Sequence, residues 1–207
     1  SAGGAILDPS DAVGGTITAH RLVITDADNI GATDPDQPGE WLTNDYALDT
    51  AIDELVITAS GDATVPAEPG ASGEVYILEA NGLPYLVADV EGDLNVATAA
   101  GDIGILAGTE PAGTGEAVLI YSSNGAVVLT AAANVTVDMV DTGHGSVTLE
   151  ALSGNVLDGD SDAANVIASD IALLATDGSV GAAGNRFDTE TTGSSLTAVA
   201  TGDNNGI

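Results

Sequence analysis

Three aspartates alternate with small residues in the stretch LDGDSDAAN, residues 157–165. Asp158, Asp160 and Asp162 have the spacing with which one loop supplies several oxygens to calcium, an ion that takes about six to eight. The stretch departs from calcium loops at Ala163, where such loops carry glycine, and no glutamate follows at the distance of the last ligand. The alternative is a solvated corner between strands, whose aspartates accept hydrogen bonds from backbone N–H groups.

A second candidate calcium loop reads DADNIG and contains Asp26 and Asp28. Gly31 is in place there, but Ile30 occupies a ligand position. Calcium is therefore the one cofactor that the sequence predicts, with Asp26, Asp28 and the three aspartates above as its candidate ligands.

Two aromatic residues, Trp41 and Tyr46, lie in the longest loop-like segment of the chain. An exposed aromatic pair with nearby Asp and Asn can stack on a sugar ring, so these two are the candidate ligand-binding residues. The alternative, which we favour, is that Trp41 anchors a loop folded back onto the protein.

The residues that most catalytic sites need are scarce. The chain has two histidines, His20 and His144, and only two basic residues, Arg21 and Arg186. A zinc site needs more His or Cys, and neither histidine lies near a serine in a nucleophile elbow. Carboxylate pairs, which many glycosidases use, carry no information in so acidic a chain. We predict that the protein is not an enzyme and has no catalytic residues.

The net charge limits the partners. The 207 residues include 32 acidic ones, and the formal net charge is −30. Such a surface repels nucleic acid and anionic lipid, so neither is an expected partner. No apolar run reaches the length of a membrane span, so we expect no membrane insertion. Cysteine is absent, which excludes disulfides and thiol chemistry.

We expect calcium or molar salt to raise the melting temperature markedly, because either relieves the self-repulsion of a chain with a net charge of −30. Thermal unfolding followed by circular dichroism, with chelator at low salt as the reference, measures the effect. An unchanged melting temperature across these conditions would contradict the prediction.

A short phrase recurs along the chain: a glycine, a small polar residue and then an aliphatic residue. Alternating aliphatic residues follow most copies, as in Leu94-Asn95-Val96, and such period-two runs predict strands. Several neighbouring phrases stand about 8 to 10 residues apart. Two such steps make roughly one 20-residue coil of a solenoid. The phrase occurs at 92–94, 101–103, 145–147, 154–156 and 178–180, with relaxed forms at 125–127, 133–135 and 164–166.

These signals predict an all-β protein, a right-handed parallel β-helix (β-solenoid) with about 20 residues per coil. Aliphatic ladders would fill its interior, and Asn, Ser, Asp and Gly would occupy its corners. The alternative is a β-sandwich, which the hairpin signals at 80–82 and 123–125 favour. We expect little helix, and the best candidate is 45–55.

A longer repeat relates the start of the chain to its end. Leu22 corresponds to Ile171 and Leu55 to Leu196, and the offset falls from near 150 to about 140 where the first copy has longer loops. We therefore predict one solenoid segment over 1–207, with about 1.4 copies of a 140–150-residue unit, cut from or built into something longer. Copy one is 1–150, partial copy two is 151–207, and the insertion loops are 33–47, 62–72 and 107–116.

The repeat also bears on the calcium prediction. The counterpart of LDGDSDAAN is LDPSDAVGG at 7–15, which keeps the outer aspartates as Asp8 and Asp11 and lacks the middle one. This weakens an obligatory calcium site in the unit and leaves a local one in the second copy.

Several stretches resemble the repeats of filamentous-haemagglutinin-like giant bacterial surface proteins. They are GDLNVATAAGDIGIL (92–106), GNVLDGDSDAANVIASDIALLATDGSVGAAGNRFDT (154–189) and LTAVATGDNNGI (196–207). The resemblance covers most of 1–32 and 92–207, whereas loops 33–47 and 62–72 depart from it. It implies a right-handed parallel β-helix from a secreted, extracellular or cell-surface adhesin, and it carries over no catalytic residues.

The leading functional prediction is a non-enzymatic structural segment of an extracellular filament or surface adhesin, which assembles end to end through β-strand stacking. Its partner would be itself or the adjacent repeat, because an end coil exposes unpaired backbone groups. The alternative is an adhesin module that binds a glycan or a host surface through Trp41 and Tyr46. A polysaccharide-degrading β-helix enzyme is disfavoured by the scarcity of basic residues.

Overall fold

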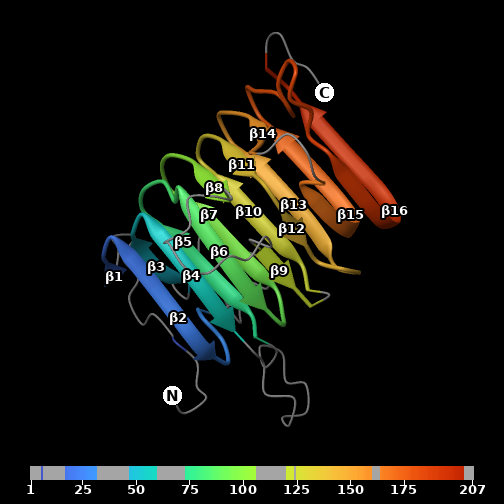
Figure 1. The fold of residues 1–207 in the computed structure, drawn as a ribbon. Coiled ribbons are helices and arrows are strands. Elements are labelled where there is room, and N and C mark those ends of the chain that lie inside the picture. Colours follow the sequence, from blue (N-terminus) through green and yellow to red (C-terminus); the bar gives the residue numbers. More distant parts are fainter. Residues whose placement is uncertain are drawn as a thin grey trace, which may run out of the picture.

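The computed structural model describes residue 6 and residues 17–31, 47–59, 73–105, 120–123, 125–159 and 164–202. Every regular element of this part is a β-strand, and the strands pair in parallel. They stack along one axis, so that the colours of Figure 1 run in order from blue to red. The described part is therefore all-β, parallel and solenoid-like, and within it the strands form no antiparallel sheets of the kind that a β-sandwich has. No helix in the described part is long and apolar enough to cross a membrane.

The strands form three columns that run along the stack, and one passage of the chain around the columns is called a coil below. β15 (Val166–Ala175) and β16 (Thr189–Ala200) each contribute to the first two columns. The first column otherwise holds β1 (Ile17–Thr18), β3 (Leu48–Ala51), β5 (Val75–Glu79), β7 (Leu94–Thr98), β10 (Val127–Ala131) and β13 (Ser146–Ala151). The second holds β2 (Arg21–Ala27), β4 (Glu54–Ala59), β6 (Tyr85–Val90), β9 (Ile120–Ser122) and β12 (Val140–Asp141). The third holds β8 (Ile103–Ile105), β11 (Val135–Val137) and β14 (Val156–Asp158).

Period-two alternation decides which side chains enter the interior. Along β13, Val147, Leu149 and Ala151 are buried, while the residues between them are only partly buried. The inward side chains of all three columns form one continuous aliphatic cluster. Each fully buried Val, Leu or Ile stabilises the fold by about 1.5–3 kcal/mol, so this cluster is the main stabilising feature.

The recurring phrase places its polar residue at the corner that leads into the third column. Asn134 donates from its backbone N and its Nδ2 to Asp102 Oδ1, at 2.8 and 3.0 Å. Asn155 repeats both bonds to Asn134 Oδ1, at 2.9 and 3.1 Å. Ser179 donates from N and Oγ to Asn155 Oδ1, at 2.9 and 3.1 Å. This ladder satisfies backbone donors at the corner, which explains why the phrase requires a small polar residue.

The same ladder shows how the length of a coil varies. Asn134 and Asp102 are 32 residues apart, whereas Asn155 and Asn134 are 21 apart and Ser179 and Asn155 are 24 apart. The longest of these separations, from Asp102 to Asn134, spans the predicted insertion 107–116.

The predicted insertion loops lie almost wholly outside the described residues. Segments 33–46, 62–72 and 107–116 are not described, and Ala47 is buried. The loop boundaries and the 140–150-residue unit stay predictions. The weak helix candidate at 45–55 is not helical in its described part, because 48–51 and most of 54–59 pair as β3 and β4 with neighbouring coils.

Candidate interface at the C-terminal end of the stack

The described end of the first aspartate motif lies in a polar corner network. Asp158 ends β14, and its Oδ1 accepts a hydrogen bond from Asn165 Nδ2 at 2.7 Å. Asn165 is fully buried, donates also to the carbonyl of Val137 at 2.8 Å, and accepts from the backbone N of Asp188 at 2.8 Å. Asp158 therefore helps to hold the side chain of Asn165, which makes the hydrogen bonds to the neighbouring coils. Asp160 and Asp162 lie outside the described residues.

The second aspartate motif is also only partly described. Asp26 belongs to β2, but its side chain lies outside the described part, and Asp28 follows the strand in a partly buried position. Across the described ranges, no three His, Cys, Asp or Glu side chains are arranged to hold a metal ion. Calcium binding stays a prediction. Trp41 and Tyr46 lie outside the described residues as well.

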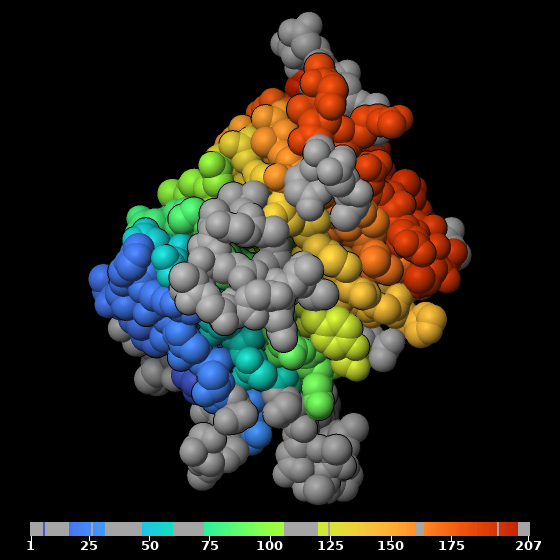
Figure 2. Space-filling view, viewed as in Figure 1, coloured from blue at the N-terminus to red at the C-terminus, as the bar shows by residue number. Residues whose placement is uncertain are grey.

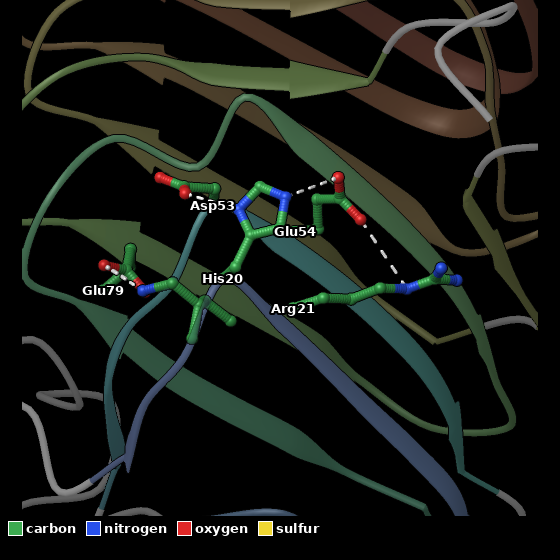
Figure 3. A network of polar contacts seen from close by, with 6 residues as sticks. His20, Arg21, Asp53, Glu54 and Glu79 are labelled. Atoms are coloured by element: carbon green, nitrogen blue, oxygen red, sulfur yellow. Dashed lines mark hydrogen bonds and ion pairs between the residues drawn. The ribbon is translucent and has the colours of Figure 1, made fainter. Parts of the chain in front are cut away.

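The first two coils share an exposed cluster of charged side chains, shown in Figure 3. His20 Nδ1 lies 2.8 Å from Asp53 Oδ2, and His20 Nε2 lies 3.4 Å from Glu54 Oε1. Arg21 Nε lies 3.7 Å from the other oxygen of Glu54. The hydrogen bond to Asp53, followed by the charge of Glu54, raises the pKa of His20. Exposed ion pairs contribute little to stability, so the cluster pairs the charges of the first two coils without adding much to the stability of the stack.

Acidic side chains also face one another on successive coils. Burial and the neighbouring carboxylate of Asp93 raise the pKa of Glu74. Asp93 Oδ1 accepts the backbone N–H of Ala126 at 2.7 Å and is therefore tied to the next coil. Glu74 and Asp93 therefore repel each other at this corner, which is one local source of the self-repulsion expected from the net charge.

A buried carboxylate joins the second and third described coils. Glu79 shares the inward side of β5 with Val75 and Ile77 and is 0 % exposed. It accepts hydrogen bonds from Thr50 Oγ1 at 2.7 Å, from Ile52 N at 3.1 Å and from Asn81 N at 3.0 Å. Glu79 is therefore an acceptor for a corner of the preceding coil and for its own corner.

The C-terminal end of the stack is open at its last strand. β16 pairs with β15 from Thr189 to Ala200, and within the described residues no strand pairs with its other edge. Figure 2 shows this last coil, in red, at one extremity of the molecule. Its unpaired backbone N–H and C=O groups are a template for another strand.

An apolar hollow of about 530 Å³ opens beside β16. It exists because the last coil carries smaller inward residues than the coil before it. Ala198 pairs with Leu173, and Thr189 pairs with Val166. Leu196 lines the hollow and is 52 % exposed, so solvent reaches the core here. The lining also includes Leu173, Val180, Arg186, Phe187 and Ala198.

Comparisons of the chain with protein-family models, with curated proteins and with solved structures find no match. The candidate site therefore stands on the geometry of the described residues.

Sequence reasoning did not single out Glu79 or the hollow beside β16. Residues 75–79 read VYILE, and four consecutive apolar residues before Glu79 give no alternation that would mark it as inward-facing. No sequence signal marks Leu196 as exposed. It is exposed because, within the described residues, no coil covers the coil of β16.

Proposed function

We propose that the protein is a non-enzymatic structural segment of an extracellular bacterial filament or surface adhesin, joined end to end through β-strand stacking. The open edge of β16, with exposed Leu196 above an apolar hollow, is the observation that carries this proposal. A further coil would pair the backbone groups of β16 and cover Leu196. Both changes remove from water the groups that the last coil leaves exposed.

The extracellular and bacterial parts of the proposal rest on the sequence resemblance described above. The described corner carboxylates and amides, such as Asp93, Asp102 and Asn155, form bonds between coils. This use of polar side chains supports a structural role, in which neighbouring coils are fastened to one another.

The proposal includes a finer fold, a right-handed parallel β-helix with about 20 residues per basic coil. The ladder separations of 21 and 24 residues support this coil length. The separation of 32 residues corresponds to a coil that carries one of the predicted insertions. Right-handedness follows from the general preference of parallel β crossovers.

Leu196→Asp tests the proposed function. At about 1 M salt, where the Debye length falls to ~3 Å, self-repulsion is screened and the unmodified chain should associate with rising concentration. A carboxylate at the covered position should weaken association about thirtyfold, the effect of losing about 2 kcal/mol at an interface centre. Sedimentation velocity across a concentration series measures it.

Leu152→Asp is the matched control. Leu152 is a leucine of similar exposure, 46 %, at the corner after β13 and away from the last coil. The Leu152→Asp variant should associate as strongly as the unmodified chain. The proposal fails if the unmodified chain is a monomer throughout the series, or if the two leucine variants behave alike.

A further inference from the structure

We infer that segment 32–46 docks on the outer face of the first column, over β5 and β7, with Trp41 as its anchor. The outer face is formed here by the outward residues of the two strands, Tyr76, Asn95 and Ala97. β3, β5 and β7 follow one another along the flank of the stack in Figure 1. The docking is therefore independent of the end-to-end association proposed above, which uses the end of the stack.

The outward side chains of β5 and β7 are buried, although a single sheet covers only its inward side. Tyr76, Asn95 and Ala97 are 6, 7 and 2 % exposed. Tyr76 and Ala97 form with Ala47 a second apolar cluster, separate from the core. Burial and the neighbouring carboxylate of Glu74 raise the pKa of Tyr76, as expected for a phenol kept from water. A parallel strand that is buried on both sides has a second layer over its outer face.

The cover lies over the first strands of the column and not over the last ones. Along one outward row the first two residues are buried, the next three are partly buried and the last is exposed. The pleated sheet by itself therefore does not bury this face. In order the row is Tyr76, Asn95, Val128, Thr148, Ala172 and Thr197.

Segment 32–46 leaves the first column and returns to it beside Tyr76. The neighbouring coil pairs with Val75 through Ile30 and with Ile77 through Leu48. Tyr76 is the one residue between the two pairs on β5, whereas the neighbouring coil has the whole of residues 31–47 there. An insertion at this place cannot enter the packed interior, so it must run over the outer face.

The segment also has the reach and the residues that the outer face requires. Half of it, fully extended, spans about 25 Å, while β10 lies about 14 Å from β3. It carries Trp41, Leu42 and Tyr46, and it ends at Ala47 of the outer cluster. Segments 60–72 and 106–119 connect different columns, and segment 7–16 contains no aromatic residue. Docking turns the aromatic pair toward the protein, which disfavours the alternative of a glycan-binding loop.

Trp41 is the single tryptophan of the chain, so its fluorescence reports the docking directly. In the unmodified chain it should emit as a buried indole. Ala97→Glu places an unpaired carboxylate under the segment, which is costly to bury. The emission should shift to that of an exposed indole, and quenching by acrylamide should rise about fivefold as the segment opens locally. Circular dichroism checks that the sheet is intact.

Ala172→Glu is the matched control, because Ala172 faces outward from the same column on β15 and is only partly buried. It should leave the emission and the quenching of Trp41 unchanged. An exposed indole in the unmodified chain overturns the inference, and so does equal quenching in the two glutamate variants.

Nitration of tyrosine, located by mass spectrometry, gives a second test that does not depend on Ala97→Glu folding. Tyr76 should be protected in the unmodified chain, while Tyr121, which is 42 % exposed, reacts. Trp41→Ala removes the anchor, and losing an aromatic anchor of a contact should raise nitration of Tyr76 about tenfold. Tyr121 should react equally in both proteins. Unchanged protection of Tyr76 in Trp41→Ala overturns the inference, because another segment would then cover the outer face.

Discussion

Gly178→Ala is expected to detach the last coil from the rest of the stack. A Cβ at Gly178 would lie 1.9 Å from the carbonyl oxygen of Gly154 and 3.0 Å from Asn155 Oδ1. The first contact is with backbone of the preceding coil, so no side-chain rotation relieves it. The corner must move apart and strain the two Ser179 bonds to Asn155. We expect a loss of about 3 kcal/mol from the overpacked corner.

The loss should be local, because each coil of a solenoid contacts mainly its neighbours. Hydrogen exchange of the β16 amides measures it, and these amides should exchange about a hundredfold faster. Amides of β7 and β10, several coils away, should keep their protection. Since β16 carries the proposed interface, end-to-end association should weaken together with its protection.

Gly184→Ala is the matched control for this prediction. Gly184 lies in the same coil, and a Cβ there meets nothing within 4 Å, although its φ of +85° makes a side chain strained. We expect a cost of about 1 kcal/mol from that backbone conformation. Equal β16 exchange rates in the two variants would show that the close approach of Gly178 to Gly154 is not what requires glycine.

Glu79→Ala is expected to lower the free energy of unfolding of the first coils by about 3 kcal/mol. The substitution leaves the buried Thr50 Oγ1 and Ile52 N without their acceptor, and it removes the acceptor of Asn81 N at a partly buried corner. Each unsatisfied buried donor costs about 1–3 kcal/mol, while removing a buried carboxylate returns part of its desolvation cost. The donors outweigh that return because two buried donors depend on this one side chain.

Urea unfolding, with hydrogen exchange of β3–β5 to locate the change, measures the Glu79 effect. The free energy of unfolding of Glu79→Gln should fall between those of the unmodified chain and Glu79→Ala. Its amide keeps one acceptor oxygen but turns an NH₂ group toward the donors. Glu150→Ala, at an outward and partly buried position of β13, should change stability by no more than about 0.5 kcal/mol. A Glu79→Ala variant as stable as Glu150→Ala would mean that water replaces the carboxylate without cost.

Glu79 and the polar corner residues show how far the sequence predicts this fold. The sequence predicts a strand at β5, but the four consecutive apolar residues before Glu79 leave open which side of this strand faces inward. It cannot identify the donors at Thr50 and Ile52, which are 29 and 27 residues away and reach Glu79 only when the coils stack. In the same way the repeated phrase predicts a polar corner, but not that one Oδ1 accepts two bonds from the next coil.

The aspartate motif shows the opposite limit. The pattern of Asp158, Asp160 and Asp162 fits either a calcium loop or a solvated corner, because both place carboxylates on one turn. Only the tertiary structure brings Asn165 to Asp158, seven residues along the chain, and so gives that carboxylate a structural partner.

The sequence by itself therefore determines the strands, their inward residues and the polar corners, because each depends on the period and residue type of a short segment. The tertiary structure alone decides which coils meet, and with that where the stack is open. Ile6 and Leu196 belong to one row with six buried residues between them, yet nothing in their local sequence marks them as its two ends. Their exposure arises because burial in a stack depends on having a neighbour on both sides, a property of the assembled coils.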